Sequence, residues 1–140
     1  MNSTQPERLL SPERAAAATA LLVSYALLID SRRARPWARL FGDSGVLVVG
    51  DRTIQGEDPL AEFATRSTPG THVQGEAILR ETAGGIVRAQ SAFVFVRNHD
   101  RGLISGWYED VLHPQGEGYT FARRTIDIRA KTPDEGAGTR

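Results

Sequence analysis

The sequence has 140 residues, and a single domain of this size can bury about two thirds of the surface that its unfolded chain exposes. Its 17 basic and 17 acidic residues cancel, so the chain lacks the excess positive charge with which proteins bind nucleic acid. It contains no cysteine, which excludes disulfide bonds, thiolate metal sites and cysteine nucleophiles. We therefore expect one domain with a hydrophobic core and no nucleic acid partner.

Both ends of the chain are polar and rich in residues that break regular structure. We expect residues 1–10 and 131–140 to be disordered and residues 11–130 to form the domain. The longest apolar stretch, residues 20–29, is about half as long as a membrane span requires. The first ten residues show no pattern of a secretory signal, so we expect a cytoplasmic protein without a membrane partner.

The first half of the chain carries helical signals. Ser11 can cap a helix that starts with Pro12, and an Ala- and Leu-rich run with three- and four-residue apolar spacing continues to about Asp30. One side of this first helix is therefore expected to face a core. The segments expected to follow are a short helix over 36–41, strands over 45–50 and 51–56, and a helix over 57–66.

Beyond residue 70 the pattern changes to long strand-like runs joined by short connectors rich in turn formers. Helices followed by antiparallel strands favour an α+β fold, and a strongly twisted sheet can curl around a helix and leave a hollow. We predict a cone-shaped α+β barrel with the N-terminal helices packed in a curved, antiparallel, mostly meander sheet. The long strands are expected over 71–82, 86–97, 102–112 and 118–129.

Several short motifs share the order and spacing found in one known family. They are the run from Tyr25 to Asp30 (YALLID), Trp37, Leu40-Phe41, Thr71-His72, residues 106–112 (GWYEDVL) and residues 119–124 (YTFARR). With these motifs the chain resembles SnoaL-like proteins of the nuclear-transport-factor-2-like superfamily over roughly residues 14–129. The resemblance is greatest to bile acid dehydratases, scytalone dehydratases and hexachlorocyclohexane dehydrochlorinases. It implies that the inside of the cone is a pocket for a small organic molecule.

The resemblance also implies a set of functional residues. Bile acid dehydratases have a tyrosine and an aspartate five positions apart near the end of the first helix, a histidine that opens the meander, and an arginine on the last strand. By resemblance the catalytic positions are Tyr25, Asp30, His72 and Arg124. The expected ligand-binding residues are Trp37, Phe41, Trp107 and Tyr108. Because strand side chains alternate, either Trp107 or Tyr108 could line the pocket, and core packing or a dimer contact is expected for the other.

Alternation on the last strand places Arg124 on a face with Ala122, Ile126 and Ile128. A charge on an apolar face needs a counter-charge or a polar ligand, because a dry and unpaired charge is costly. An ion pair and a ligand contact are both consistent with this pattern.

Asp30 lies near the C-terminus of the first helix, where the helix dipole disfavours a negative charge unless a positive group compensates. If His72 is that group, the carboxylate would fix the imidazole tautomer and leave a general base that can take a proton next to a carbonyl or leaving group. Tyr25 could then polarise an oxygen of the ligand. The alternatives are a solvated helix end for Asp30, a structural histidine, and a core tyrosine that bonds to the backbone.

No metal or other cofactor is expected. His99 and His113 lie in expected turns, and no spacing brings three metal ligands together. The resemblance and its four mapped residues imply the function of a cofactor-independent lyase or isomerase, such as a dehydratase, acting on a polyketide-, steroid- or aromatic-like compound.

Two other classes of function remain open. Residues 91–97 (SAFVFVR) and 106–112 also resemble the β subunits of aromatic-ring-hydroxylating dioxygenases, whose partner is a Rieske-type large subunit. A binding protein for a small apolar or aromatic molecule, without chemistry, is the other. A homodimer is expected in each case, because the outer face of a curled sheet, with residues such as Phe93 and Phe95 or their neighbours, needs cover.

Overall fold

The computed structural model describes residues 7–134, and it contains the predicted order of helices followed by strands. The elements are α1 (Pro12–Asp30), α2 (Ala34–Arg39), β1 (Val46–Val49), β2 (Arg52–Gln55), α3 (Glu57–Arg66), β3 (Gly70–Gln74), β4 (Ile78–Glu81), the 3-10 turn η1 (Ala83–Gly85), β5 (Val87–Arg97), β6 (Leu103–Gln115) and β7 (Gly118–Lys131).

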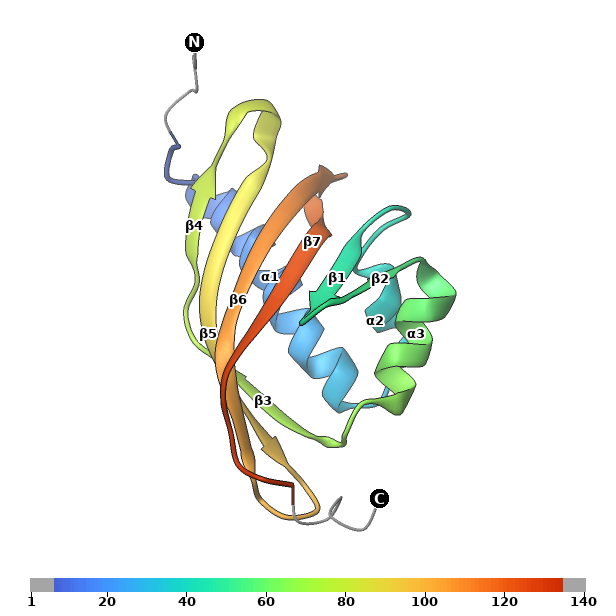
Figure 1. Cartoon of the computed structure of the whole chain (residues 1–140). Coiled ribbons are helices and arrows are strands. Elements are labelled where there is room, and N and C mark those ends of the chain that lie inside the picture. The colour runs from blue at the N-terminus through green and yellow to red at the C-terminus, as the bar shows by residue number, and fades with distance from the viewer. Residues whose placement is uncertain (1–6, 135–140) are drawn as a thin grey trace.

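The strands form one curved sheet, and the helices lie against one of its faces (Figure 1). The strand order is β2-β1-β7-β6-β5-β3, and β4 pairs with β5 as well. The meander β5-β6-β7 is antiparallel, whereas β1 pairs with β7 in parallel. The curved sheet stays open at its edges. The predicted α+β fold is confirmed, with the helices filling the inside of the curve.

The first helix begins where the sequence predicts. The Ser11 hydroxyl accepts a hydrogen bond from the backbone N–H of Arg14, and Pro12 occupies the first turn. By length and composition α1 would pass a simple test for a membrane-crossing helix, with a mean hydropathy of 1.2, but core helices of soluble proteins pass the same test. Its buried face consists of Ala18, Leu21, Leu22, Tyr25 and Ile29. This helix carries two of the expected site residues, Tyr25 and Asp30, to the inner face of the sheet.

The strand predicted over 71–82 is in fact two strands. β3 ends at Gln74 and β4 begins at Ile78, and both pair with the long strand β5. The connection is Gly75-Glu76-Ala77, in which the Gly75 N–H still donates to the carbonyl of Ala92 on β5. β3 is thus separate from β4, and its residue His72 contacts Asp30 at the end of α1.

A β-bulge changes the face pattern predicted for β7. The register between β6 and β7 shifts between Val111 and Leu112, so Leu112 pairs with Phe121 while Asp110 pairs with Arg124. Phe121 and Arg124 consequently both face the core, and Phe121 is fully buried. The prediction that Ala122 shares the face of Arg124 is wrong, because the extra residue of the bulge resets the alternation.

The chain ends also differ from the prediction. Arg8 exchanges backbone hydrogen bonds with Glu81, so the disordered segment expected over 1–10 does not extend to residue 8. At the other end β7 continues to Lys131, and the N–H of Thr132 donates to the carbonyl of Leu103. The remaining residues of the predicted tails, 1–6 and 135–140, lie outside the described residues.

A buried arginine fastens the described C-terminal segment to the β5–β6 turn. Arg97 is 1% exposed and donates to both carboxylate oxygens of Asp100, at 2.9 and 3.0 Å. Its Nη2 also donates to the carbonyls of Thr132 and Pro133. Gly102 is needed beside it, because a Cβ at that position would lie 1.9 Å from Nη2. The buried guanidinium of Arg97 therefore holds Thr132 and Pro133, just beyond β7, against the β5–β6 turn.

We predict that Asp100→Asn lowers stability in a pH-dependent way. The hydrogen bonds from Arg97 hold the pKa of Asp100 at about 2, below its usual 3.8. The ionised carboxylate therefore stabilises the fold fully above about pH 4, and this contribution is lost as the pH falls toward 2. The variant should be less stable than the wild type at pH 7 and should lose less stability between pH 4 and pH 2.

Denaturant unfolding followed by circular dichroism at several pH values measures this difference. The control is Asp127→Asn, because the ion pair of Asp127 with Arg129 is exposed and such pairs contribute little. Equal stability of Asp100→Asn and the wild type at pH 7 would contradict the prediction.

Candidate functional site

His72 and Asp30 form the contact that the sequence analysis expected. Nδ1 of His72 lies 2.6 Å from Oδ1 of Asp30, and the backbone N–H of His72 donates to Oδ2 at 2.7 Å. An ionised carboxylate can only accept, so Nδ1 carries a hydrogen, and in the neutral imidazole the lone pair is on Nε2. The two side chains are 14% and 19% exposed, so the dyad is partly accessible from solvent.

The end of α1 holds the carboxylate in place. Asp30 is the last residue of the helix, and the next residues turn back so that the N–H groups of Ser31 and Arg32 donate to Leu27 and Ile29. Arg32 adopts a positive φ of 64°, which is uncommon for a residue with a side chain. Its guanidinium donates to the Thr65 carbonyl in the last turn of α3 and to the hydroxyl of Ser67, which follows that helix. The strained turn is thus held by the next helix, and it fixes the position of Asp30.

Tyr25 lies beside His72. Its ring contacts the ring of His72 edge-on, at 6.1 Å between centroids, and it is 1% exposed. Burial raises the pKa of Tyr25 to about 12, although the nearby Arg124 acts in the opposite direction. The hydroxyl consequently remains protonated over the physiological pH range and can donate a hydrogen bond.

Arg124 forms a fully buried ion pair with Asp110. Its Nε and Nη2 donate to the two carboxylate oxygens at 2.8 and 3.0 Å, and both side chains are 0% exposed. The guanidinium lies 3.6 Å from the ring centroid of Tyr108 and 4.2 Å from that of Tyr25. Burial alone would lower the pKa of Arg124, but the adjacent carboxylate of Asp110 outweighs it and raises that pKa. Nη1 is buried without a partner among the described residues.

Asp110 was not identified as a site residue from the sequence. It shares its strand face with Ile104, Gly106, Tyr108 and Leu112, so the argument that singled out Arg124, a charge on an apolar face, applies equally to it. Of the two alternatives left open for Arg124, the ion pair is therefore present.

The expected ligand-binding residues do not all face the interior. Trp37, Phe41 and Tyr108 are at most 1% exposed and pack around Tyr25 and Phe121. Trp107 is half exposed on the opposite face of the sheet, where Arg129 lies over its ring. The interior role for Trp107 is wrong, because neighbouring residues on β6 point to opposite faces.

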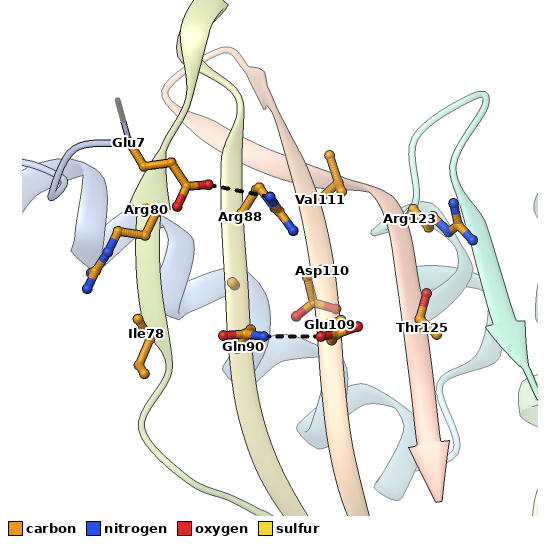
Figure 2. A pocket seen from close by; sticks show the side chains of 11 residues that line it. Glu7, Ile78, Arg80, Arg88, Gln90, Glu109, Asp110, Val111, Arg123 and Thr125 are labelled. Carbon is orange, nitrogen blue, oxygen red and sulfur yellow. Dashed lines mark hydrogen bonds and ion pairs between the residues drawn. The ribbon is translucent and has the colours of Figure 1, made fainter. Parts of the chain in front are cut away.

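Four hollows on the surface are lined by the described residues, and none of these four is lined by His72 or Asp30. Figure 2 shows one of about 410 Å³ on the sheet face opposite the helices. Its lining is polar: Arg88 pairs with Glu7, Gln90 donates to Glu109, and Arg123 lies nearby. This hollow differs in character from the apolar pocket that the sequence analysis expected inside the cone.

A histidine and two aspartates gather at the β5–β6 turn, contrary to the expectation that no three ligands meet. Nε2 of His99 lies 2.8 Å from Asp134 and 3.6 Å from Asp100, and the ligand atoms of the three lie within 4.8 Å of one another. Asp100 is, however, held on both oxygens by Arg97, and a guanidinium beside the cluster opposes a bound cation. Hydrogen bonding accounts for this cluster, and we assign no metal to it.

The helices in a curved sheet, with a His–Asp pair and a buried arginine inside, define a cone-shaped α+β protein of the nuclear-transport-factor-2-like kind. A family model of the SnoaL-like domain matches residues 12–125. The chain therefore belongs to the SnoaL-like family. No curated protein matches the sequence.

Solved structures with this fold differ in what they do. Rv3472 from Mycobacterium tuberculosis, of unknown function, is 26% identical, with a TM-score of 0.72 over 79% of this chain and 69% of its own. A hexachlorocyclohexane dehydrochlorinase (LinA) Type2 is 17% identical, with a TM-score of 0.72 over 86% and 88%. A β subunit assigned to an aromatic-ring-hydroxylating dioxygenase of Novosphingobium aromaticivorans is 19% identical, with a TM-score of 0.70 over 83% and 89%. The last two similarities establish the fold alone.

We predict that Asp110→Ala strongly destabilises the protein. It leaves the guanidinium of Arg124 buried without its counter-charge, and breaking such a pair costs about 3–5 kcal/mol of unfolding free energy. The double variant Asp110→Leu with Arg124→Met removes both charges and should be more stable than the single variant. Denaturant unfolding measures both, and a double variant less stable than Asp110→Ala would contradict the prediction.

Proposed function

We propose that this protein is a cofactor-independent lyase or isomerase in which His72 is the general base. The observation that carries the proposal is the 2.6 Å contact between Nδ1 of His72 and Asp30, which orients a partly exposed imidazole so that Nε2 of the neutral ring can take a proton. The proposed substrate is a small polyketide-, steroid- or aromatic-like molecule, because the side chains around the dyad are mostly aromatic. Tyr25, Phe93 and Phe95 all contact the ring of His72.

The proposed reaction on a β-hydroxy ketone is the loss of water. Nε2 of His72 takes a proton from the carbon next to the carbonyl, and the C–H electron pair forms an enolate. Tyr25, which stays protonated, and Nη1 of Arg124, which has no other partner among the described residues, stabilise the negative oxygen. The C–O bond then breaks with its electron pair, and the departing hydroxyl receives the proton from His72 and leaves as water. Asp30 orients the imidazole throughout.

The proposal predicts that His72→Asn abolishes elimination. The probe is 3-hydroxy-1-tetralone, a bicyclic β-hydroxy ketone whose dehydration product tautomerises to the fluorescent 1-naphthol. Loss of a general base lowers the rate by about 10²–10⁴-fold, so the variant should lose at least about 100-fold in kcat/KM, and Asp30→Asn should lose activity as well.

The control for this prediction is His113→Asn, which alters an exposed histidine at the far end of β6. Turnover that is unchanged in His72→Asn would overturn the mechanism. A wild type that binds the probe but releases no product would favour the alternative of a binding protein without chemistry.

We also propose that the protein forms a homodimer through the outer face of the sheet. Phe93 and Phe95, expected on this face, lie instead on the inner face against His72 and Tyr108. Their neighbours take the outer positions, and large apolar side chains stand exposed there on four adjoining strands. They are Val73, Ile78, Val94, Leu103 and Trp107.

The dimer proposal predicts that Trp107→Glu produces a monomer. The charge would be buried without a partner at the centre of the contact, so the sedimentation coefficient should fall to that of one chain. The matched control is Leu27→Glu, which places the same charge on the exposed side of α1 and should leave the mass unchanged. A wild type that is monomeric at high concentration would contradict the proposal.

The same outer face is consistent with a second candidate function, that of a β subunit that braces a Rieske-type large subunit. The fold of an oxygenase β subunit and the exposed ring of Trp107 favour it. Stable co-purification with such a large subunit, abolished by Trp107→Glu, would support this candidate over the homodimer.

A further inference from the structure

Besides Arg97 and Arg124, two polar side chains on the inner face of the sheet have buried atoms without hydrogen-bond partners among the described residues. They are Gln74 on β3, through its Oε1, and Ser91 on β5, through its Oγ. A buried polar group that finds no partner costs about 1–3 kcal/mol, and native proteins keep few of them. Neither residue has a role in the reaction proposed above.

The two residues lie beside the dyad rather than elsewhere in the sheet. Gln74 follows His72 by two positions on β3, so both side chains point inward. Gln74 pairs with Phe93 on β5, and Ser91 precedes Phe93 by two positions, which places it on the same face. Gln74 and Ser91 are thus diagonal cross-strand neighbours on one face of the sheet, next to Phe93. That ring lies 6.4 Å from His72 and stacks on Tyr108 at 4.4 Å.

The chemistry of the pair is complementary to one common group. The carboxamide oxygen of Gln74 is an acceptor, and the hydroxyl of Ser91 can donate as well as accept. A hydroxyl placed between them can donate to Gln74 and accept from Ser91, so that both unpartnered groups are satisfied at once. A carbonyl or an ether could accept from Ser91 but would leave the Gln74 oxygen unpaired.

We propose that Gln74 and Ser91 bind a hydroxyl group of the ligand and so make the site selective for hydroxylated molecules. This inference rests on the proposed function, since it places the ligand beside His72. It adds two specificity-determining residues, and it assigns them to binding rather than to proton transfer.

The test compares ligands that differ by one hydroxyl. Binding of 1-tetralone and of its 3-hydroxy and 6-hydroxy derivatives is measured by calorimetry in the His72→Asn background, where no elimination should interfere. At least one hydroxylated compound should bind about fivefold or more tightly than 1-tetralone, and Gln74→Met should remove that preference while leaving 1-tetralone binding unchanged. Ser91→Ala should reduce the same preference.

A matched control and a stability measurement separate this role from a structural one. Gln90→Met makes the same change on the outer face of β5, where Gln90 donates to Glu109, and should leave the preference intact. Because Gln74→Met replaces an unpartnered buried oxygen by an apolar group of similar shape, its melting temperature should equal or exceed that of the wild type.

Each outcome of the binding test bears on the inference. A hydroxyl preference that survives in both Gln74→Met and Ser91→Ala overturns the inference. The absence of any preference in the His72→Asn protein that keeps Gln74 and Ser91 also overturns it. Failure of the proposed function has a different signature, which is turnover that does not depend on His72. A preference that is lost in Gln74→Met supports the inference even if the wild type proves to bind without chemistry.

Discussion

The buried ion pair between Arg124 and Asp110 sets the constraint on which the interior depends. Two charges without solvent exposure are stable only with good geometry, and here a bidentate contact is enclosed by the rings of Tyr25 and Tyr108. The pair joins β6 to β7 beside the bulge, where the alternation of side chains changes. Asp110 takes two of the five N–H donors of the guanidinium, and Nη1 is the nitrogen of Arg124 that has no partner among the described residues.

The dyad is held in a different way, by the backbone rather than by burial. Asp30 accepts from both the ring and the main chain of His72, so one carboxylate fixes the strand and the imidazole together. The turn after α1 places that carboxylate, and Arg32 secures the turn against the segment after α3. The base thus stays partly exposed while the group that would stabilise negative charge is buried. This separation suits the proposed reaction, in which the substrate proton is taken by a partly exposed base while the negative oxygen is stabilised by buried donors.

How far the sequence predicted these features depends on whether the signal was local. Helix α1, with its Ser11 cap, and the turn-bounded strands follow from local patterns, and their order predicted the α+β fold. The contact of His72 with Asp30 joins residues 42 positions apart, and the family resemblance, rather than periodicity, pointed to it. The bulge at β7 could not be foreseen, because one extra residue inverts a face without changing composition. Asp110 could have been predicted as a paired buried charge, because it too lies on an otherwise apolar strand face.

Several polar atoms inside the cone have no hydrogen-bond partner among the described residues. Two of the unpartnered donors, Nη1 of Arg124 and Nε1 of Trp37, belong to side chains that contact Tyr25, whereas the unpartnered acceptor of Gln74 lies on β3, opposite Phe93 of β5. A ligand bound beside His72 would therefore have one orientation in which its negative oxygen meets donors and its hydroxyl meets an acceptor. In the reverse orientation the oxygen would face Gln74 and the donors would stay unpaired, at a cost of about 1–3 kcal/mol for each group. The asymmetry, rather than the number of polar groups, would determine which carbon is presented to the base.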